Sequence, residues 1–214
     1  MADVVLHLAQ TDEFAVASAE QRVPPVEERD EWIVDDDNTV DEAAGDLVAA
    51  ERDQPPGAIH ERWRTGAERL RAALRAVGPH ERVNWVVGEV SVRTLTTTRL
   101  AETWIHTGDV AHAFDAEPQV DDRLWHIARL AWRTLPYAFS RAGRELHGPV
   151  AFALGAPDEG RWDLVPSGEP VTSVHGPALD LCLVAARRLD PADSALRAEG
   201  PDADAVLELV RTYA

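Results

Sequence analysis

The sequence predicts a mostly helical α+β protein, with a helical bundle first and a small mixed domain after it. Apolar residues recur at helical spacing through the first half of the chain, whereas short β-branched and aromatic runs between turn residues begin at residue 149. The Glu117-Pro118 step lies between these two regimes, and a proline disfavours helix in the residue before it. We therefore expect a helical domain over residues 1–117 and an α+β domain over residues 118–214.

Three long helices are expected in the first domain, over residues 2–23, 57–77 and from Ser91 to about Phe114. The pattern of the second helix stops at Gly78-Pro79, as a helix end should. Ser91 is a favourable N-cap for the third helix, because its hydroxyl can accept a hydrogen bond from the first turn. These helices form the expected bundle.

An acidic segment separates the first two of these helices. From Glu20 to Asp53 there are thirteen acidic residues against three arginines, with a Pro-Pro pair near each end. Such a charge run is typical of a solvated loop, here with a short helix near residues 39–52. A cation-binding or repulsive lid is the alternative interpretation.

The second domain is expected to begin with a helix over about residues 121–141, which Pro136 should bend or shorten. Three short apolar runs then predict a small antiparallel sheet, over residues 149–154, 161–165 and 170–174. Gly176-Pro177 opens a further helix that reaches Arg188, and a last helix is expected over about residues 202–213.

Composition excludes several functions. The net charge of −17 and the isoelectric point of about 4.7 argue against nucleic acid or an anionic membrane as the main partner. All basic residues are arginine, and the missing lysine excludes a Walker A loop, a pyridoxal-phosphate Schiff base and a biotinyl-lysine. The single cysteine, Cys182, cannot form an internal disulfide, and no apolar run reaches the ~18 residues of a membrane span. We expect a cytoplasmic protein.

One helical stretch concentrates polar residues of catalytic type. Glu102, His106 and Asp109 are spaced so that, at about 100° per residue, they fall within an arc of about 60° on one helix face. Ile105 and Val110 flank this polar stripe, which indicates that it faces the protein interior. A buried Glu-His pair needs either a cation or a complete hydrogen-bond network.

A carboxylate and an imidazole four residues apart supply two ligands of a metal site, and catalytic metals usually take three protein ligands. His7 is the best third candidate, because it lies beside Leu8 on an amphipathic helix that can face the 91–114 helix across a bundle. The spacing alone leaves a second interpretation open, in which Glu102 and His106 form an interior hydrogen-bonded pair and His7 is merely packed.

Three runs resemble one protein family. They are His7-Leu8-Ala9, the run Arg-Leu-Ala-Glu-Thr-Trp-Ile-His over residues 99–106 with Asp109-Val110, and Gly-Pro-Ala-Leu-Asp-Leu-Cys-Leu-Val over residues 176–184. Over essentially its whole length the chain resembles the actinobacterial maleylpyruvate-isomerase-like proteins, a branch of the DinB-type metalloenzymes. The resemblance implies a metal-binding helical bundle joined to a small α+β domain, with His7, Glu102 and His106 as ligands of a divalent ion, zinc by preference.

The resemblance also implies a function. The metal would activate a low-molecular-weight thiol such as mycothiol, in a thiol-dependent isomerisation or transfer on a small electrophile. The residues themselves suggest further roles. Asp109 is expected to orient a ligand histidine or to act as general base, and a purely structural carboxylate on the helix face is the alternative. Arg187 and Arg188 are expected to bind the thiol cofactor or an anionic substrate, although charge near a helix C-terminus also explains them. Cys182 lies among apolar neighbours and is expected to be inert.

One departure from the family pattern bears on assembly. Family bundles have a further helix before the one with the first histidine, and here Met1 stands six residues before His7. Either that helix is missing or the start of the protein lies upstream. A bundle without it would expose an apolar stripe, which a second copy of the chain or a ligand would cover. Two other functions stay open: a thiol-independent metal-dependent hydratase, dehydratase or cyclase, and a non-catalytic small-molecule-binding or assembly module.

Overall fold

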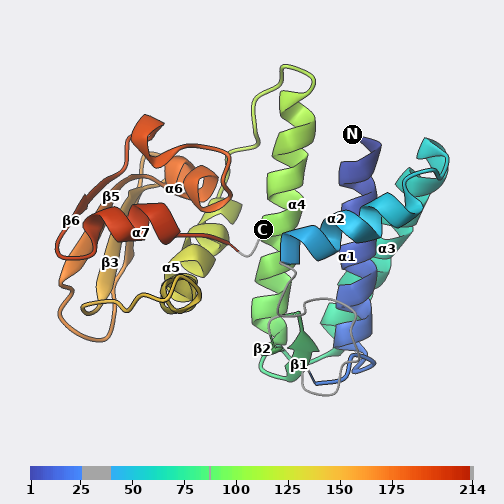
Figure 1. Ribbon diagram of the computed structural model, residues 1–214, viewed down its shortest axis with the longest axis horizontal. Helices are drawn as coiled ribbons and strands as arrows, with labels where there is room; N and C mark the ends of the chain where they lie inside the picture. Colours follow the sequence, from blue (N-terminus) through green and yellow to red (C-terminus); the bar gives the residue numbers. More distant parts are fainter. Residues whose placement is uncertain (26–39, 87, 213–214) are drawn as a thin grey trace. The chain divides into compact units, whose positions relative to one another are not determined.

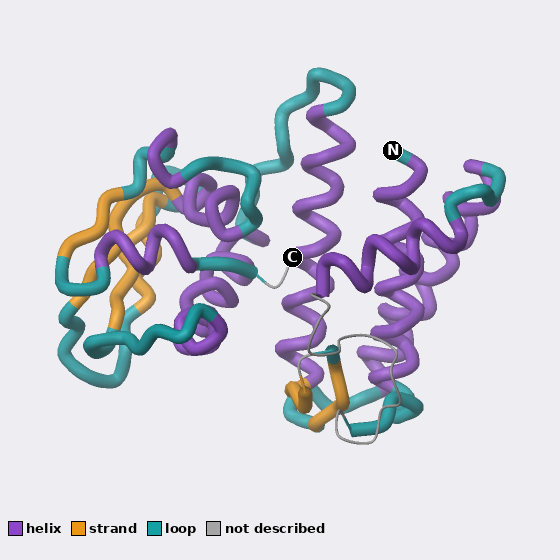
Figure 2. Tube along the Cα trace, viewed as in Figure 1, coloured by secondary structure: helices purple, strands orange, loops and turns teal. Residues whose placement is uncertain are grey.

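The computed structural model describes residues 1–25, 40–86 and 88–212. The chain folds into two compact units, Met1–Glu117 and Pro118–Ala214, and each is described by itself. Helices predominate in both, and the strands form small sheets, so the predicted mostly helical α+β class is confirmed (Figure 2). The acidic stretch over residues 26–39, for which we expect a solvated loop or a lid, lies outside the described residues. In the described part no helix is long and apolar enough to cross a membrane.

The first unit is built around one central helix. Its helices are α1 (Ala2–Ala19), α2 (Val40–Glu51), α3 (Pro56–Ala76) and α4 (Val92–His112). Helix α1 packs against the other three, and α1 and α4 run antiparallel, so that residues near the start of α1 lie level with residues near the end of α4 (Figure 1). This arrangement lets two segments far apart in sequence share one helix–helix seam.

The helix ends follow local chemistry. The N-cap of α4 is confirmed, because the hydroxyl of Ser91 accepts a hydrogen bond from the backbone N–H of Thr94 at 3.1 Å. Helix α1 ends at Ala19 rather than at the expected residue 23. The reason is Gln21, whose φ of 55° takes the chain into the left-handed region and out of the helix.

A hairpin that the sequence pattern does not reveal closes one end of this unit. Its strands β1 (Arg82–Trp85) and β2 (Gly88–Ser91) pair antiparallel. Val83 and Trp85 are buried in an apolar cluster with residues of α1, α3 and α4, namely Ala15, Val16, Leu70, Val92 and Leu95. The hairpin therefore covers the end of the bundle that lies opposite the start of α1.

The second unit holds α5 (Arg123–Arg141), α6 (Ala178–Ala185) and α7 (Ala203–Leu209) around a four-stranded sheet. Helix α5 continues through Pro136, which lies on its exposed side, so the expected shortening does not occur. Helices α6 and α7 end earlier than predicted, at Ala185 and Leu209.

The sheet of the second unit is mixed, which corrects the predicted antiparallel sheet. Its strands are β3 (Val150–Gly155), β4 (Arg161–Leu164), β5 (Thr172–Pro177) and β6 (Arg197–Glu199), in the order β4-β3-β5-β6. After the β3–β4 hairpin the chain crosses to the free edge of β3, so β5 pairs parallel to β3. Strand β3 becomes central, and its alternate residues Val150, Phe152 and Leu154 are buried.

Candidate metal centre

The three predicted ligand residues come together in the first unit. His7 projects from α1, and Glu102 and His106 project from α4, although 95 residues separate His7 from Glu102. One potential ligand atom from each of the three lies within 4.8 Å of the other two. Within the described part of the chain, this is the one group of three or more histidines, cysteines or carboxylates that is spaced closely enough to hold a metal ion.

The nitrogen atoms of both histidines lie close enough to one oxygen of Glu102 to share a cation with it. His7 Nε2 lies 3.3 Å from Glu102 Oε2, and His106 Nε2 lies 3.6 Å from the same oxygen. Both exceed the usual range of about 2.7–3.2 Å for N–H···O bonds. Zinc bonds of about 2.1 Å in a tetrahedron place neighbouring ligand atoms about 3.4 Å apart. Two imidazole nitrogens and one carboxylate oxygen are donors that zinc takes, and the two distances to Glu102 Oε2 are close to this value.

The outer nitrogen of His106 has its own partner. His106 Nδ1 lies 2.9 Å from Asp109 Oδ2, one helical turn further along α4. When this carboxylate accepts a hydrogen from Nδ1, the lone pair remains on Nε2, the nitrogen that faces Glu102. Asp109 is thus placed to orient a ligand histidine, which is one of the two roles expected for it.

Glu102 is ionised in its largely buried position. Its side chain is 12% exposed. Burial by itself raises the pKa of this carboxyl. When no metal is bound and the Nε2 atoms of His106 and His7 carry the hydrogens, their hydrogen bonds and the positive charge of Arg99 outweigh burial and lower the pKa to about 2. A bound cation would replace these hydrogens beside the carboxylate. A carboxylate that stays deprotonated at neutral pH is the form a metal ligand needs.

A buried ion pair that the sequence pattern does not reveal lies beside the triad. The Arg99 guanidinium donates to Asp12 Oδ1 from Nε at 3.1 Å and from Nη2 at 3.0 Å. The side chains are only 5% and 4% exposed. The signal available in the sequence was the position of Arg99, which stands three residues before Glu102 on the polar side of α4. Its partner on another helix had no local signal.

Arg187 and Arg188 lie in the second unit and directly follow Ala186, the C-cap of α6, so both charges are close to that helix C-terminus. Arg187 has a φ of 60° and donates from Nη1 to the backbone oxygen of Glu208 at 2.8 Å. Arg188 donates from Nη1 to the backbone oxygen of Ala186. Their role in binding a thiol cofactor or an anion stays a prediction.

Cys182 has the surroundings of an inert thiol. It is fully buried in α6, and its sulfur lies 3.6 Å from the backbone oxygen of Leu124. Burial raises the pKa of the Cys182 thiol far above its usual value, because the thiolate would lose its hydration. The expectation that burial raises this pKa is confirmed.

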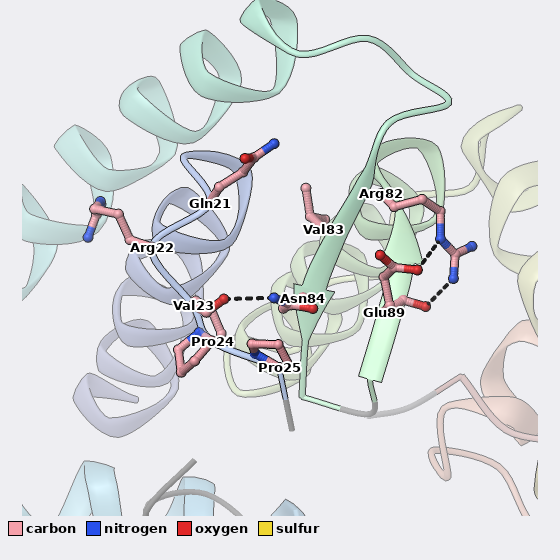
Figure 3. Close-up of a pocket in the computed structure, with 9 residues that line it drawn as sticks. All are labelled: Gln21, Arg22, Val23, Pro24, Pro25, Arg82, Val83, Asn84 and Glu89. Carbon is pink, nitrogen blue, oxygen red and sulfur yellow. Dashed lines mark hydrogen bonds and ion pairs between the residues drawn. The ribbon is translucent and has the colours of Figure 1, made fainter. Parts of the chain in front are cut away.

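A pocket of about 480 Å³ lies at the hairpin end of the first unit, among the residues that follow α1 and the two strands (Figure 3). Among its polar groups, Arg82 pairs with Glu89, and the Asn84 amide donates to the backbone oxygen of Val23. His7, Glu102 and His106 are not among its lining residues. This pocket offers no set of metal ligands.

A helical bundle with a His-Glu-His cluster on two of its helices, followed by a small α+β unit, is the architecture that the family resemblance implies. Comparison with family models is more specific. Residues 1–111 match the mycothiol maleylpyruvate isomerase N-terminal domain, and residues 126–207 match the C-terminal domain of the same family. The chain therefore belongs to the mycothiol-dependent maleylpyruvate isomerase-like family.

Individual proteins are also similar to this chain. Two uncharacterized proteins from strains of Mycobacterium tuberculosis are each 29% identical over 209 residues, which cover 97% of this chain and 79% of theirs. Two crystal structures of the mycothiol-dependent maleylpyruvate isomerase share the fold. One is a histidine-to-alanine mutant, with a TM-score of 0.59 and 20% identity, and the other has a TM-score of 0.57 and 21% identity. Both matches cover 94% of this chain and 80% of the solved chain.

Proposed function

We propose that His7, Glu102 and His106 hold one divalent metal ion, zinc by preference, and that the protein is a metal-dependent enzyme. The observation that carries the proposal is the spacing of the three ligand atoms, within 4.8 Å of one another on two facing helices. Three protein ligands would leave a bound zinc ion free to take water or substrate as a further ligand, which is typical of catalytic rather than structural zinc sites.

Each residue then has a defined task. With a metal bound, His7 and His106 would each offer the lone pair of Nε2, and the Glu102 carboxylate would supply negative charge between them. Asp109 keeps the His106 proton on Nδ1. A zinc ion bound here supplies a Lewis acid that lowers the pKa of a thiol or water at its open position toward about 7.

The nucleophile comes from outside the chain in this proposal. The protein has one cysteine and no lysine, and burial keeps the Cys182 thiol protonated. A thiol cosubstrate fills this need, and the family to which the chain belongs is named for its use of mycothiol. We infer a thiol-dependent isomerisation or thiol transfer on a small electrophile, with mycothiol as the first thiol to test.

The test compares the zinc-loaded protein with and without mycothiol on a panel of small electrophiles that includes maleylpyruvate, beside a chelated control. The proposal expects turnover that needs both zinc and thiol. Full turnover without thiol would remove the thiol-dependent function and favour a hydratase, dehydratase or cyclase. Full turnover after verified removal of zinc would contradict a metal-dependent reaction.

A further inference from the structure

Two helices must keep a fixed register for the triad to form. His7 belongs to α1, whereas Glu102 and His106 belong to α4, and functional constellations generally need placement within about 0.5 Å. Sliding α1 along α4 by a fraction of a turn would separate His7 from the other two ligands. The seam between these helices therefore has to contain something that resists sliding.

The α1–α4 seam has three successive levels. At the first, His7 of α1 faces Glu102 and His106 of α4. At the second, Asp12 and its neighbour Thr11 face Arg99. At the third, Ala15 and Val16 share an apolar cluster with Val92 and Leu95 of α4. The order of the levels follows from the antiparallel course of the helices (Figure 1).

The second level is held by hydrogen bonds, which depend on direction. Apolar contacts are non-directional, so the third level tolerates small shifts. The Arg99 guanidinium instead donates to Asp12 Oδ1 from two nitrogens, at 3.1 and 3.0 Å, and from Nη2 to Thr11 Oγ1 at 2.8 Å. A planar guanidinium held at several points fixes both distance and orientation.

Thr11 connects the Arg99–Asp12 ion pair to His7, the metal-ligand candidate on the same helix. Its hydroxyl accepts from Arg99 and donates to the backbone oxygen of His7 at 2.8 Å. On the other helix, Arg99 stands one turn before Glu102. The ion pair is therefore linked to the ligand-bearing turn on each helix.

The burial of both charged side chains carries a desolvation cost. Asp12 is 3% exposed and Arg99 is 4% exposed as whole residues. Exchanging a buried ion pair for apolar side chains of similar volume is often neutral or stabilising, and the best-attested benefit of such pairs is a fixed register. The two opposite charges also cancel, so that the Arg99 cation is not left uncompensated one turn from a site for another cation.

We infer that the Arg99–Asp12 ion pair, with Thr11, is a positioning device that sets the register of α1 on α4 and so preorganises the metal centre. The inference rests on the proposed metal site and adds residues that touch neither metal nor substrate. The inference predicts different effects on stability and on metal affinity. Removing both charges together should lower the zinc affinity but leave the stability of the fold unchanged.

The main experiment measures zinc affinity by competition with a chromogenic chelator, and apo-protein melting by circular dichroism. The double variant Asp12→Leu/Arg99→Met should melt at or above the wild-type temperature and bind zinc about tenfold more weakly or worse, as typical losses of outer-shell support do. The visible bands of the cobalt-loaded variant should shift, because the ligand geometry is less constrained. Wild-type affinity and an unchanged cobalt spectrum in the folded double variant would overturn the inference.

Two further variants complete the design. Arg99→Lys keeps the charge and loses the planar fork, and it should also lose about tenfold in zinc affinity; unchanged affinity would contradict the geometric role, even if the double variant failed to fold. Glu13→Gln is the matched control, because Glu13 neighbours Asp12 on α1 but pairs with Arg62 of α3, and it should retain wild-type affinity. Failure of the wild type itself to bind zinc would instead contradict the proposed function.

Discussion

The two units of the protein both bury charged side chains, and they use them differently. In the first unit, Arg99 and Asp12 are 87 residues apart and join two helices directly beside Glu102. In the second unit, the Asp202 carboxylate is 3% exposed and accepts from the backbone N–H of His147 at 2.9 Å, with the His147 ring 2.7 Å away. The second arrangement ties two loops together. The buried charge of the first unit lies beside the proposed metal centre, and that of the second unit joins loop segments of the chain.

The largest effect is expected at the carboxylate of the triad. Glu102→Gln keeps the size of the side chain but removes its negative charge, so zinc affinity should fall by more than about 100-fold, beyond the loss typical of outer-shell residues. Isothermal titration of the apo-protein with zinc measures it. Glu61→Gln, at an exposed position on α3, is the control and should bind as wild type does. Equal binding by both variants would remove Glu102 from the site.

A variant of the buried carboxylate in the second unit should lose stability and keep its zinc affinity. Asp202→Ala leaves the His147 N–H without its acceptor and should lower the free energy of unfolding by about 2 kcal/mol. For a chain of this length that loss lowers Tm by roughly 4–8 °C in scanning calorimetry. Zinc affinity should not change. The exposed Asp204→Ala on α7 is the control, and a loss of zinc binding in Asp202→Ala would break the contrast between the units.

A smaller effect on the same metal site is expected at Asp109. Asp109→Ala removes the acceptor of His106 Nδ1, so the imidazole is free to rotate or to change tautomer, and zinc affinity should fall by about tenfold. Competition with a chelator measures the change. A general base that does not support His106 would behave differently, with unchanged affinity and reduced turnover only, and that result would overturn the orienting role.

The smallest effect is expected at the buried thiol of the second unit. Because burial raises the pKa of Cys182, a disulfide reagent at neutral pH should not modify the folded protein and should react fully after denaturation. Cys182→Ala should leave zinc affinity and turnover close to wild type. Loss of turnover with normal folding would show that the nucleophile does come from the chain.

The sequence predicted the local parts of the candidate site and missed its non-local support. Glu102, His106 and Asp109 share a face because the helical period fixes their spacing, so their proximity could be predicted from one segment. His7 was placed by its apolar context and by the family resemblance. The partner of Arg99 depends on which helix packs against α4 and in what register, and no local pattern carries that information.

The same distinction applies to the fold. The N-cap at Ser91 and the short helix α2 were predicted, since capping and periodicity are properties of neighbouring residues. Strand β6 is a three-residue Arg-Ala-Glu segment without a strand pattern, and it exists because β5 offers it a paired edge. The parallel pairing of β5 with β3 likewise follows from where the chain crosses the sheet, which strand propensity does not specify.

The most direct test of the account is the position of the metal itself. Anomalous diffraction at the zinc absorption edge, on crystals of the zinc-loaded protein, locates the ion independently of any assay. The account predicts one strong peak per chain, about 2.0–2.2 Å from His7 Nε2, Glu102 Oε2 and His106 Nε2. A fully occupied zinc ion elsewhere, with these three side chains still hydrogen-bonded only to each other, would contradict it.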